Sequence, residues 1–363
     1  MLVSLACITQ VVLLLLLVPK SAAHALAVTR ATPSTCNGYS QLCDRSYGNV
    51  TFVGAHDSYA VSSTNLAANQ DYNVTQQLKD GVRMLQLQAH NQSGVIQLCH
   101  TSCGLLNGGT LANYLNSVKS WMDENPNEVV SMLIVNSYDN ILPAAYASVF
   151  SDAGLDSVAY APTNATVAAS AWPTLGDMIS SGKRLVVFLT TRADYQEVPY
   201  LIDEFTNIWE TAYDVTTTFD CAVNRTNGDS NTQMYLINHF LDIDLGLGLL
   251  MPDKNAAAAT NGVSGANSLG QQAATCVSDY HRSPNFMLVD FYEYGNGSVF
   301  QVAATANGVT YNPSTPIAQA GGSSSSSSAT TGGALPFMRV TPAQLGASFA
   351  VTAGVFLGAL SVL

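Results

Sequence analysis

Residues 53–60, Val-Gly-Ala-His-Asp-Ser-Tyr-Ala, decide the fold when they are taken together with residues 96–103, Ile-Gln-Leu-Cys-His-Thr-Ser-Cys. In each stretch a histidine, His56 or His100, ends a short apolar run that is typical of a buried strand. We therefore expect both rings to emerge at the same edge of a sheet. Two imidazoles that face one pocket suit the cleavage of a phosphodiester, because one removes a proton from the attacking hydroxyl and the other protonates the leaving oxygen.

A third segment, residues 79–90, lies between these histidines with the sequence Lys-Asp-Gly-Val-Arg-Met-Leu-Gln-Leu-Gln-Ala-His. With this segment included, the chain resembles the X-domain family of phosphatidylinositol-specific phospholipases C, which are phospholipase-C-like phosphodiesterases. The resemblance lies in motifs in the N-terminal part of the chain and in the rhythm of strands over the rest. It implies a distorted TIM barrel, in which the chemistry lies at the carboxyl ends of the strands, where His56 and His100 fall.

Apolar runs recur along the chain with helical segments between them. Because these runs are continuous rather than alternating, they are typical of strands that are covered on both faces, as in parallel sheets. Asn113–Glu124 has the apolar period of an amphipathic helix. This pattern indicates an α/β fold and leaves a (β/α) barrel and an open doubly wound sheet both open, whereas the resemblance favours a single barrel. The runs are Val50–Ala55, Arg83–Ala89, Val95–Leu98, Val129–Val135, Arg184–Leu189, Tyr235–Leu241 and Phe286–Phe291.

The composition suits one large domain. No Pro/Gly/Ser-rich linker divides the chain between Cys36 and Pro313, so we expect one barrel over residues 24–315. Of the 363 residues, 47% are hydrophobic and 10% are charged, which is ample for a sizeable core. The formal net charge is −12 and no cluster of Lys and Arg is present, which argues against nucleic acid and against electrostatic docking on anionic lipid. No protein partner is predicted.

Both ends of the chain carry targeting signals. The apolar run Val11–Val18 and the small residues that follow it predict a signal peptide over residues 1–23, with an uncleaved anchor as the alternative. A Ser/Gly-rich stalk over residues 316–333 leads to a predicted GPI-attachment signal, residues 334–363. The apolar tail Leu345–Leu363 has no basic residue after it, which favours lipidation over a single-span anchor. We therefore expect a secreted protein on the outer leaflet of the plasma membrane or in the cell wall.

The cysteines and the glycosylation sequons support the same route. Cys7 leaves with the signal peptide, so six of the seven cysteines remain for disulfides, with fifteen connectivities open. Proximity in the sequence favours Cys36–Cys43, Cys99–Cys103 and Cys221–Cys276, and a metal site is disfavoured because no second Cys/His cluster pairs with Cys99 and His100. The six Asn-x-Ser/Thr sequons predict surface glycans at Asn49, Asn73, Asn91, Asn164, Asn224 and Asn296.

The resemblance assigns the roles of the histidines. His56 matches the general base that deprotonates the inositol 2-hydroxyl, and His100 matches the general acid that releases diacylglycerol and leaves a cyclic inositol phosphate. Asp57 either orients a ring or forms an Asx-type turn at the strand exit. Asp290 is a carboxylate in an otherwise apolar strand and needs a partner there, so we expect it to hold His56 and to have a perturbed pKa.

Two glutamines depart from the family pattern. Calcium-dependent members carry Glu-x-Asp and calcium-independent members carry Asp-Ile-Arg where this chain has Gln86-Leu-Gln88. Neutral amides are poor calcium ligands, so we expect no bound Ca²⁺ and no other cofactor, and we expect both glutamines to donate hydrogen bonds to substrate. The expected phosphate contacts at neighbouring strand ends are Arg192 and Asn136, with Tyr138. His90 and His239 are weaker candidates, and Arg83 is expected to be structural.

These residues leave two functions open. The first is an extracellular phosphoric diester hydrolase that cleaves a phosphoinositide-type phospholipid by metal-independent catalysis with two histidines. The second is a catalytically degenerate barrel that acts as a GPI-anchored lipid-binding, glycan-binding or wall protein, which the loss of the charged pair at Gln86 and Gln88 would explain. A shared cleft for His56 and His100, with a cation and Asp290 nearby, would favour the enzyme, whereas a cleft closed by aromatic side chains would favour the binding protein.

Overall fold

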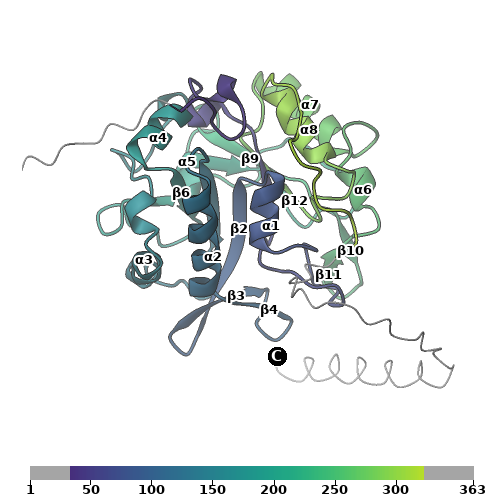
Figure 1. The fold of residues 1–363 in the computed structure, drawn as a ribbon. Coiled ribbons are helices and arrows are strands. Elements are labelled where there is room, and N and C mark those ends of the chain that lie inside the picture. Colours follow the sequence, from purple (N-terminus) through teal and green to yellow (C-terminus); the bar gives the residue numbers. More distant parts are fainter. Residues whose placement is uncertain (1–32, 323–363) are drawn as a thin grey trace, which may run out of the picture. The chain divides into compact units, whose positions relative to one another are not determined.

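The computed structural model describes residues 33–322, and the predicted signal peptide, most of the stalk and the GPI-attachment signal lie outside the described residues. Parallel strands form one curled sheet in the order β7-β6-β5-β2-β1-β12-β9-β8 (Figure 1). The four-residue helix α5 (Glu204–Asn207) connects β7 to β8, the two ends of this order. The strands are β1 (Phe52–Ala55), β2 (Met84–Gln92), β5 (Val130–Val135), β6 (Leu185–Leu189), β7 (Leu201–Asp203), β8 (Ile208–Glu210), β9 (Met234–Asn238) and β12 (Phe286–Val289).

Helices cover the outside of this sheet, which makes the fold the expected distorted α/β barrel. Side chains at Asn73, Thr110 and Thr174 cap the first turns of α1, α2 and α4 by accepting a backbone hydrogen bond. No helix within residues 33–322 is both long enough and apolar enough to cross a bilayer. The helices are α1 (Val74–Asp80), α2 (Leu111–Glu124), α3 (Pro143–Asp152), α4 (Leu175–Ser181), α6 (Ala257–Thr260), α7 (Leu269–Tyr280) and α8 (Ser298–Ala306).

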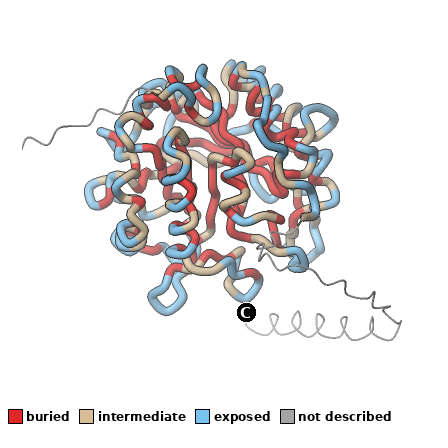
Figure 2. The backbone as a smooth tube through the Cα atoms, in the orientation of Figure 1, coloured by how far each residue is buried: buried red, intermediate tan, exposed pale blue. Residues whose placement is uncertain are grey.

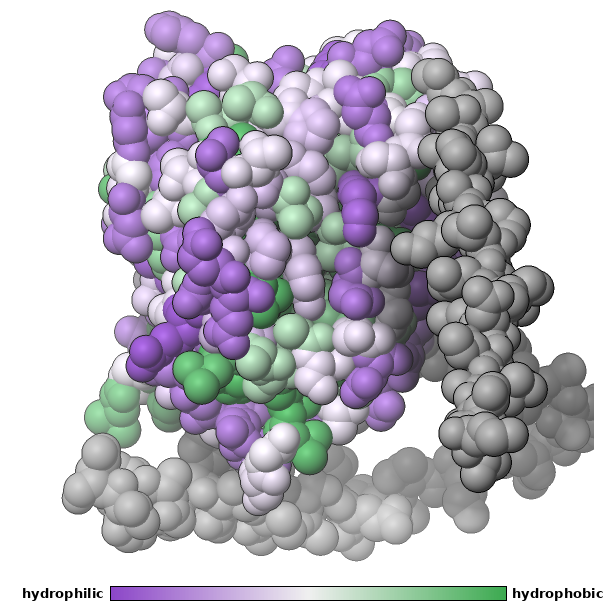
Figure 3. Space-filling view, turned by 90° about the vertical axis from the view of Figure 1, so that its left-hand side faces the viewer, coloured by the Kyte–Doolittle hydropathy of each residue, from purple (hydrophilic) through white to green (hydrophobic). Residues whose placement is uncertain are grey.

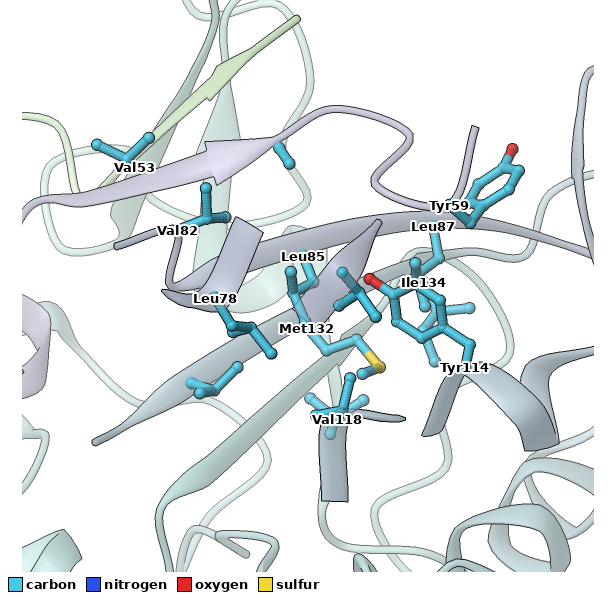
Figure 4. Packing of buried hydrophobic residues seen from close by; sticks show 14 of the residues in the cluster. Val53, Tyr59, Leu78, Val82, Leu85, Leu87, Tyr114, Val118, Met132 and Ile134 are labelled. Atoms are coloured by element: carbon cyan, nitrogen blue, oxygen red, sulfur yellow. The ribbon is translucent and has the colours of Figure 1, made fainter. Parts of the chain in front are cut away.

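The core has two layers because successive side chains of a strand point to opposite faces. Leu85 on β2 belongs to the layer between sheet and helices, where Met132 and Val118 pack beside it (Figure 4). Met84, its neighbour, belongs to the layer that fills the barrel. Figure 2 shows the barrel strands buried along most of their length, while the exposed residues lie on helices, on loops, at the outer end of β2 and on strands outside the barrel. Gln86 and Gln88 are two and four residues after Met84 on the same strand, so their side chains point to the inside of the barrel as that of Met84 does. They lie nearer the carboxyl end of the strand than Met84, beyond the packed interior.

One predicted strand differs in direction. Residues 95–98 were expected in the parallel sheet, but β3 (Val95–His100) runs antiparallel to β2 and pairs on its other side with β4 (Leu106–Thr110). The reason is a tight turn at Ser93 and Gly94, which have φ values of 54° and 89°. A second ribbon, β10 (Asp242–Asp244) with β11 (Leu250–Pro252), was not predicted.

The predicted disulfides are confirmed, since Cys36–Cys43, Cys99–Cys103 and Cys221–Cys276 are all bonded. The six sequon asparagines are all exposed, so each is accessible to a glycosyltransferase. Glycosylation itself stays a prediction.

Candidate active site

His56 and Asp290 meet because their strands are neighbours in register. Ala55 ends β1 opposite Val289 at the end of β12, so the next residue of each strand emerges at the same place. The Nδ1 atom of His56 lies 2.9 Å from Oδ1 of Asp290. Asn69 donates from Nδ2 to both carboxylate oxygens of Asp290, at 3.1 Å each. The carboxylate therefore fixes the imidazole, and the Asn69 amide fixes the carboxylate.

One face of the His56 ring and its Nε2 edge also have neighbours. Phe240, just past β9, stacks on the imidazole with the ring centroids 3.7 Å apart and the planes 4° from parallel. The Nε2 atom remains directed toward Asp57, with 3.9 Å to Oδ2. His56 thus has one nitrogen occupied by Asp290 and one facing Asp57.

Asp57 lies between the two histidines. It is fully buried, and its Oδ2 lies 3.4 Å from Nε2 of His100 as well as 3.9 Å from Nε2 of His56. Its backbone has a φ of 39°, in the left-handed region that aspartate tolerates better than most residues. Both rings therefore converge on one carboxylate oxygen, although β3 is antiparallel and His100 does not belong to a barrel strand.

The two glutamines connect these residues to one another. Gln86 accepts a hydrogen bond from the backbone N–H of Asp57 at 2.6 Å. Gln88 donates from Nε2 to Oδ2 of Asp57 at 2.9 Å and accepts from the N–H of Thr101, beside His100, at 2.9 Å. Gln88 is thus a bridge between the segment that carries His56 and the loop that carries His100.

Burial and mutual charge separate the pKa values of these groups. Burial lowers the pKa of His56, but Asp290, Asp57 and Asp242 together raise it to about 9. Burial, with the charge of His56, lowers the pKa of His100 to about 4. Burial raises the pKa of Asp57 to about 7 against the charge of His56. Near neutral pH the free protein therefore holds a proton on His56, none on His100, and a titrating carboxyl group between them.

Three residues of this site were missed by sequence reasoning. Asn69 belongs to a polar loop and Phe240 follows a strand, so neither stood out by its type. Asp242 is 9% exposed, and burial and Asp290 raise its pKa to about 7. Asp242 lies just past an apolar run of the sequence. The same kind of position identified Asp290 and would have identified Asp242.

Two residues expected in the site do not join it. Asn136 is fully buried and its amide is occupied by the backbone of Ile141 and Thr191 and by the hydroxyl of Tyr146. This makes it a brace for the loop after β5. Arg192 follows β6 and is exposed, and within residues 33–322 no hydrogen bond or ion pair links it to either histidine.

The remaining candidates have partners elsewhere. His90 lies 3.6 Å from Asp139 and packs against Tyr138. His239 is buried between Gln272 and the carbonyl of Thr260, and burial lowers its pKa to about 4. Arg83 pairs with Glu128 at the amino end of β2, as expected of a structural residue.

The residues of the site do not fit a bound calcium ion. Hard cations prefer several oxygen ligands, ideally carboxylates. Here Gln86 and Gln88 stand where carboxylates would be needed, and their amide oxygens already accept hydrogen bonds from Asp57 and Thr101. No cluster of three or more His, Cys, Asp or Glu suited to a metal lies in the part of the chain that the structure describes.

Comparison with known proteins identifies the family of this chain. The family model described as PI-PLC X 1 matches residues 42–307, and the chain therefore belongs to the PI-PLC X domain family. It is 46% identical over 287 residues to an uncharacterized secreted protein of Arthroderma benhamiae, with 76% of this chain and 65% of that protein covered. It is 41% identical over 288 residues to a PI-PLC X domain-containing protein 1 of the same organism, with 78% and 92% covered.

Similarity to solved structures is more distant. A double mutant of the phosphatidylinositol-specific phospholipase C from Staphylococcus aureus aligns at 17% identity with a TM-score of 0.49. That alignment covers 75% of this chain and 96% of the other. The barrel assignment rests on the strand order described above and on the family match.

Proposed function

We propose that this protein is a phosphodiesterase that cleaves a phosphoinositide-type phospholipid by acid–base catalysis between His56 and His100, without a metal ion. The observation that carries the proposal is the convergence of both Nε2 atoms on Oδ2 of Asp57, at 3.9 and 3.4 Å. The hydrogen bond from His56 to Asp290 supports it further, because a carboxylate on Nδ1 leaves Nε2 to exchange a proton with substrate.

In the proposed reaction His56 takes the proton of the inositol 2-hydroxyl as that oxygen attacks phosphorus. The bond from phosphorus to the diacylglycerol oxygen then breaks, and the pair of Asp57 and His100 supplies the proton to this leaving oxygen. The products are diacylglycerol and a cyclic inositol phosphate. Asp290 stabilises the imidazolium that forms on His56, and this is why its burial beside that ring is useful.

The pKa values give this reaction an unusual starting point. In the free protein His56, with a pKa of about 9, holds the proton that a base must lack, whereas His100, with a pKa of about 4, lacks the proton that an acid must hold. Only the minor form, with neutral His56 and a protonated pair of Asp57 and His100, starts the reaction. The negative charge of a bound phosphodiester favours the protonated form of the Asp57 and His100 pair.

A phospholipid substrate fits the surface around the site. Leu66, Leu142 and Leu247 are 71%, 62% and 93% exposed; Leu66 and Leu142 lie on the segments after β1 and β5, and Leu247 lies in the turn between β10 and β11. Figure 3 shows strongly hydrophobic residues gathered along the lower edge of one face, at the height where β3 and β4 lie in Figure 1. An apolar rim around the histidines suits an acyl-chain substrate better than a water-soluble diester.

The proposed location is the cell exterior. The name of the secreted relative supports secretion, and the apolar C-terminal tail supports a GPI anchor in the outer leaflet. The disulfides and the exposed sequon asparagines are consistent with that compartment.

The test is hydrolysis of phosphatidylinositol vesicles by the full chain, produced through a secretory host, in excess EDTA. We expect turnover that resists EDTA and falls by about 10²–10⁴-fold in both His56→Ala and His100→Ala, as is typical of lost acid–base groups. His281→Asn is the matched control, since this exposed histidine ends α7 in the left-handed conformation that asparagine tolerates. A folded protein that turns over no phosphodiester would overturn the proposal and favour a lipid- or glycan-binding barrel.

A further inference from the structure

The loop that carries His100 is closed by a disulfide. Cys99 and Cys103 are bonded at a sequence separation of 4, so the closed loop consists of Cys99, His100, Thr101, Ser102 and Cys103. We propose that this disulfide is a positioning element that holds the His100 imidazole against Asp57, and that opening it lowers turnover while the barrel stays folded. The inference rests on the proposed function, because that function gives His100 its proton transfer.

The strand pairing alone does not hold His100 in place. β3 lies outside the barrel, and its pairing with β2 ends at Leu98. Beyond that residue only β4 pairs with β3, and the register shifts between Gln97 and Cys99. His100 therefore lies where the strand has one hydrogen-bonded neighbour and an irregular ladder, which is a weak support for a residue that must meet a fixed carboxylate.

The ring itself is short of polar partners that would orient it. Its Nδ1 has no hydrogen-bond partner among residues 33–322, and its Nε2 has the 3.4 Å contact with Asp57. The next residue, Thr101, has a φ of 55°, which is unfavourable for a β-branched side chain and persists only where the surroundings enforce it. Its N–H bond to Gln88 is one such restraint, and the disulfide across the loop is the other.

This disulfide differs from the other two that the described residues contain. Cys99 is buried, as are Cys36, Cys43, Cys221 and Cys276, whereas Cys103 is half-buried and is followed by an exposed glycine, so this bond is open to solvent at one of its two cysteines. The Cys99–Cys103 loop is also the shortest, and a short closed loop restricts the unfolded chain least. Its position beside a proposed catalytic residue therefore explains it better than the stability of the barrel does.

The exposure of Cys103 also makes the bond accessible to a dithiol. Reduction transfers two electrons and two protons from the dithiol to the sulfur–sulfur bond. Cys99 and Cys103 become thiols, and the dithiol becomes a cyclic disulfide. The structure thus gives the site a sensitivity to reducing agents that the two buried disulfides do not share.

The experiment compares the full-length double variant Cys99→Ser/Cys103→Ser with Cys36→Ser/Cys43→Ser, whose disulfide lies before β1 at the opposite end of the barrel. We expect kcat on phosphatidylinositol to fall by about 10–100-fold in the first variant with little change in KM, as for a displaced catalytic group. The control variant should keep the kcat of the wild type. Brief treatment of the wild type with dithiothreitol should reproduce the loss, and reoxidation should restore kcat.

A second readout needs no turnover. Selective ¹⁵N-histidine labelling follows the titration of His100, which should move from a depressed pKa toward 6.5 when the loop opens into water. If the wild type hydrolyses no diester, the proposed function fails while this titration still tests the positioning role. An unchanged titration with an unchanged kcat would overturn the inference. Loss of cooperative unfolding in the double variant would overturn it as well, because the disulfide would then hold the barrel rather than His100.

Discussion

The Asp290 carboxylate is the main reason why His56 keeps its proton, and Asp290→Asn tests this directly. In the wild type the pKa of His56 is raised from 6.5 to about 9 even though burial alone would lower it. At about 1.4 kcal/mol per pKa unit, this net shift favours the protonated ring by about 3 kcal/mol in the folded protein. The ring is 13% exposed, so solvent screens this interaction little. Asparagine keeps the shape and one of the two oxygens that accept from Asn69 but removes the charge, so we expect the pKa of His56 to fall from about 9 toward 6.5.

The sign for stability follows from the same shift. Because the folded pKa of His56 is raised, its contribution is fully present below pH 6.5 and is lost as the pH rises through about 9. The free energy of unfolding of Asp290→Asn should therefore lie below that of the wild type by up to about 3 kcal/mol at pH 6. The gap should close by pH 10, where the wild type has a buried carboxylate beside a neutral ring.

The measurements are a ¹H NMR titration of His56 and urea unfolding at pH 6, 8 and 10. Asp152→Asn serves as the control, since this exposed carboxylate at the end of α3 changes the net charge equally. A His56 pKa that stays near 9 in Asp290→Asn would refute the reasoning, because the shift would then have another source. So would a loss of stability that is the same at all three pH values.

Three further outcomes follow from the packing and the charges. Gln88→Arg places a cation beside Asp57, so the pKa of that carboxyl group should fall below its value of about 7, which a pH–rate profile would show as an acid-side limb moved to lower pH. Gly54→Ala puts a Cβ 2.5 Å from a leucine methyl inside the barrel and should cost about 1–3 kcal/mol in urea unfolding. Lys254→Met removes the partner of buried Asp71, and because the lysine is partly exposed the loss should stay below the roughly 3–5 kcal/mol typical of fully buried pairs, as thermal unfolding would measure.

The barrel could be predicted wherever the apolar pattern was continuous. The runs that begin at Val129 and Arg184 became β5 and β6, and helix α2 lies within one or two residues of its predicted range. The predicted parallel direction of β3 was wrong because an apolar run looks the same in a parallel and in an antiparallel strand. The turn at Ser93 and Gly94, which reverses the chain, was not recognised. The leucine- and glycine-rich ribbon of β10 and β11 has no period that a short window detects.

The site was predictable where chemistry and strand ends coincide. His56, Asp57 and Asp290 each follow or end an apolar run, so their types and positions together indicated one cluster. Asn69 and Phe240 act through a hydrogen bond and a ring face that only the tertiary structure defines. Polar residues after other strands looked equivalent in sequence, and only the contacts of its amide show that Asn136 braces a loop.

The two glutamines change the charge of the site more than its geometry. An arginine at position 88 would compensate charge on phosphorus, but it would also keep Asp57 ionised. Gln88 donates a hydrogen bond to the same oxygen without adding charge, so burial holds the pKa of Asp57 at about 7 and the carboxyl group retains a proton in part of the population at neutral pH. The Oδ2 atom of this carboxyl group lies 3.4 Å from Nε2 of His100, whose pKa of about 4 leaves that ring without a proton at this pH. Gln88 therefore leaves a protonated carboxyl group beside His100, but it provides no positive charge to stabilise the phosphorane. On the proposed function turnover should be slow, and it should peak above neutral pH, where His56 begins to lose its proton.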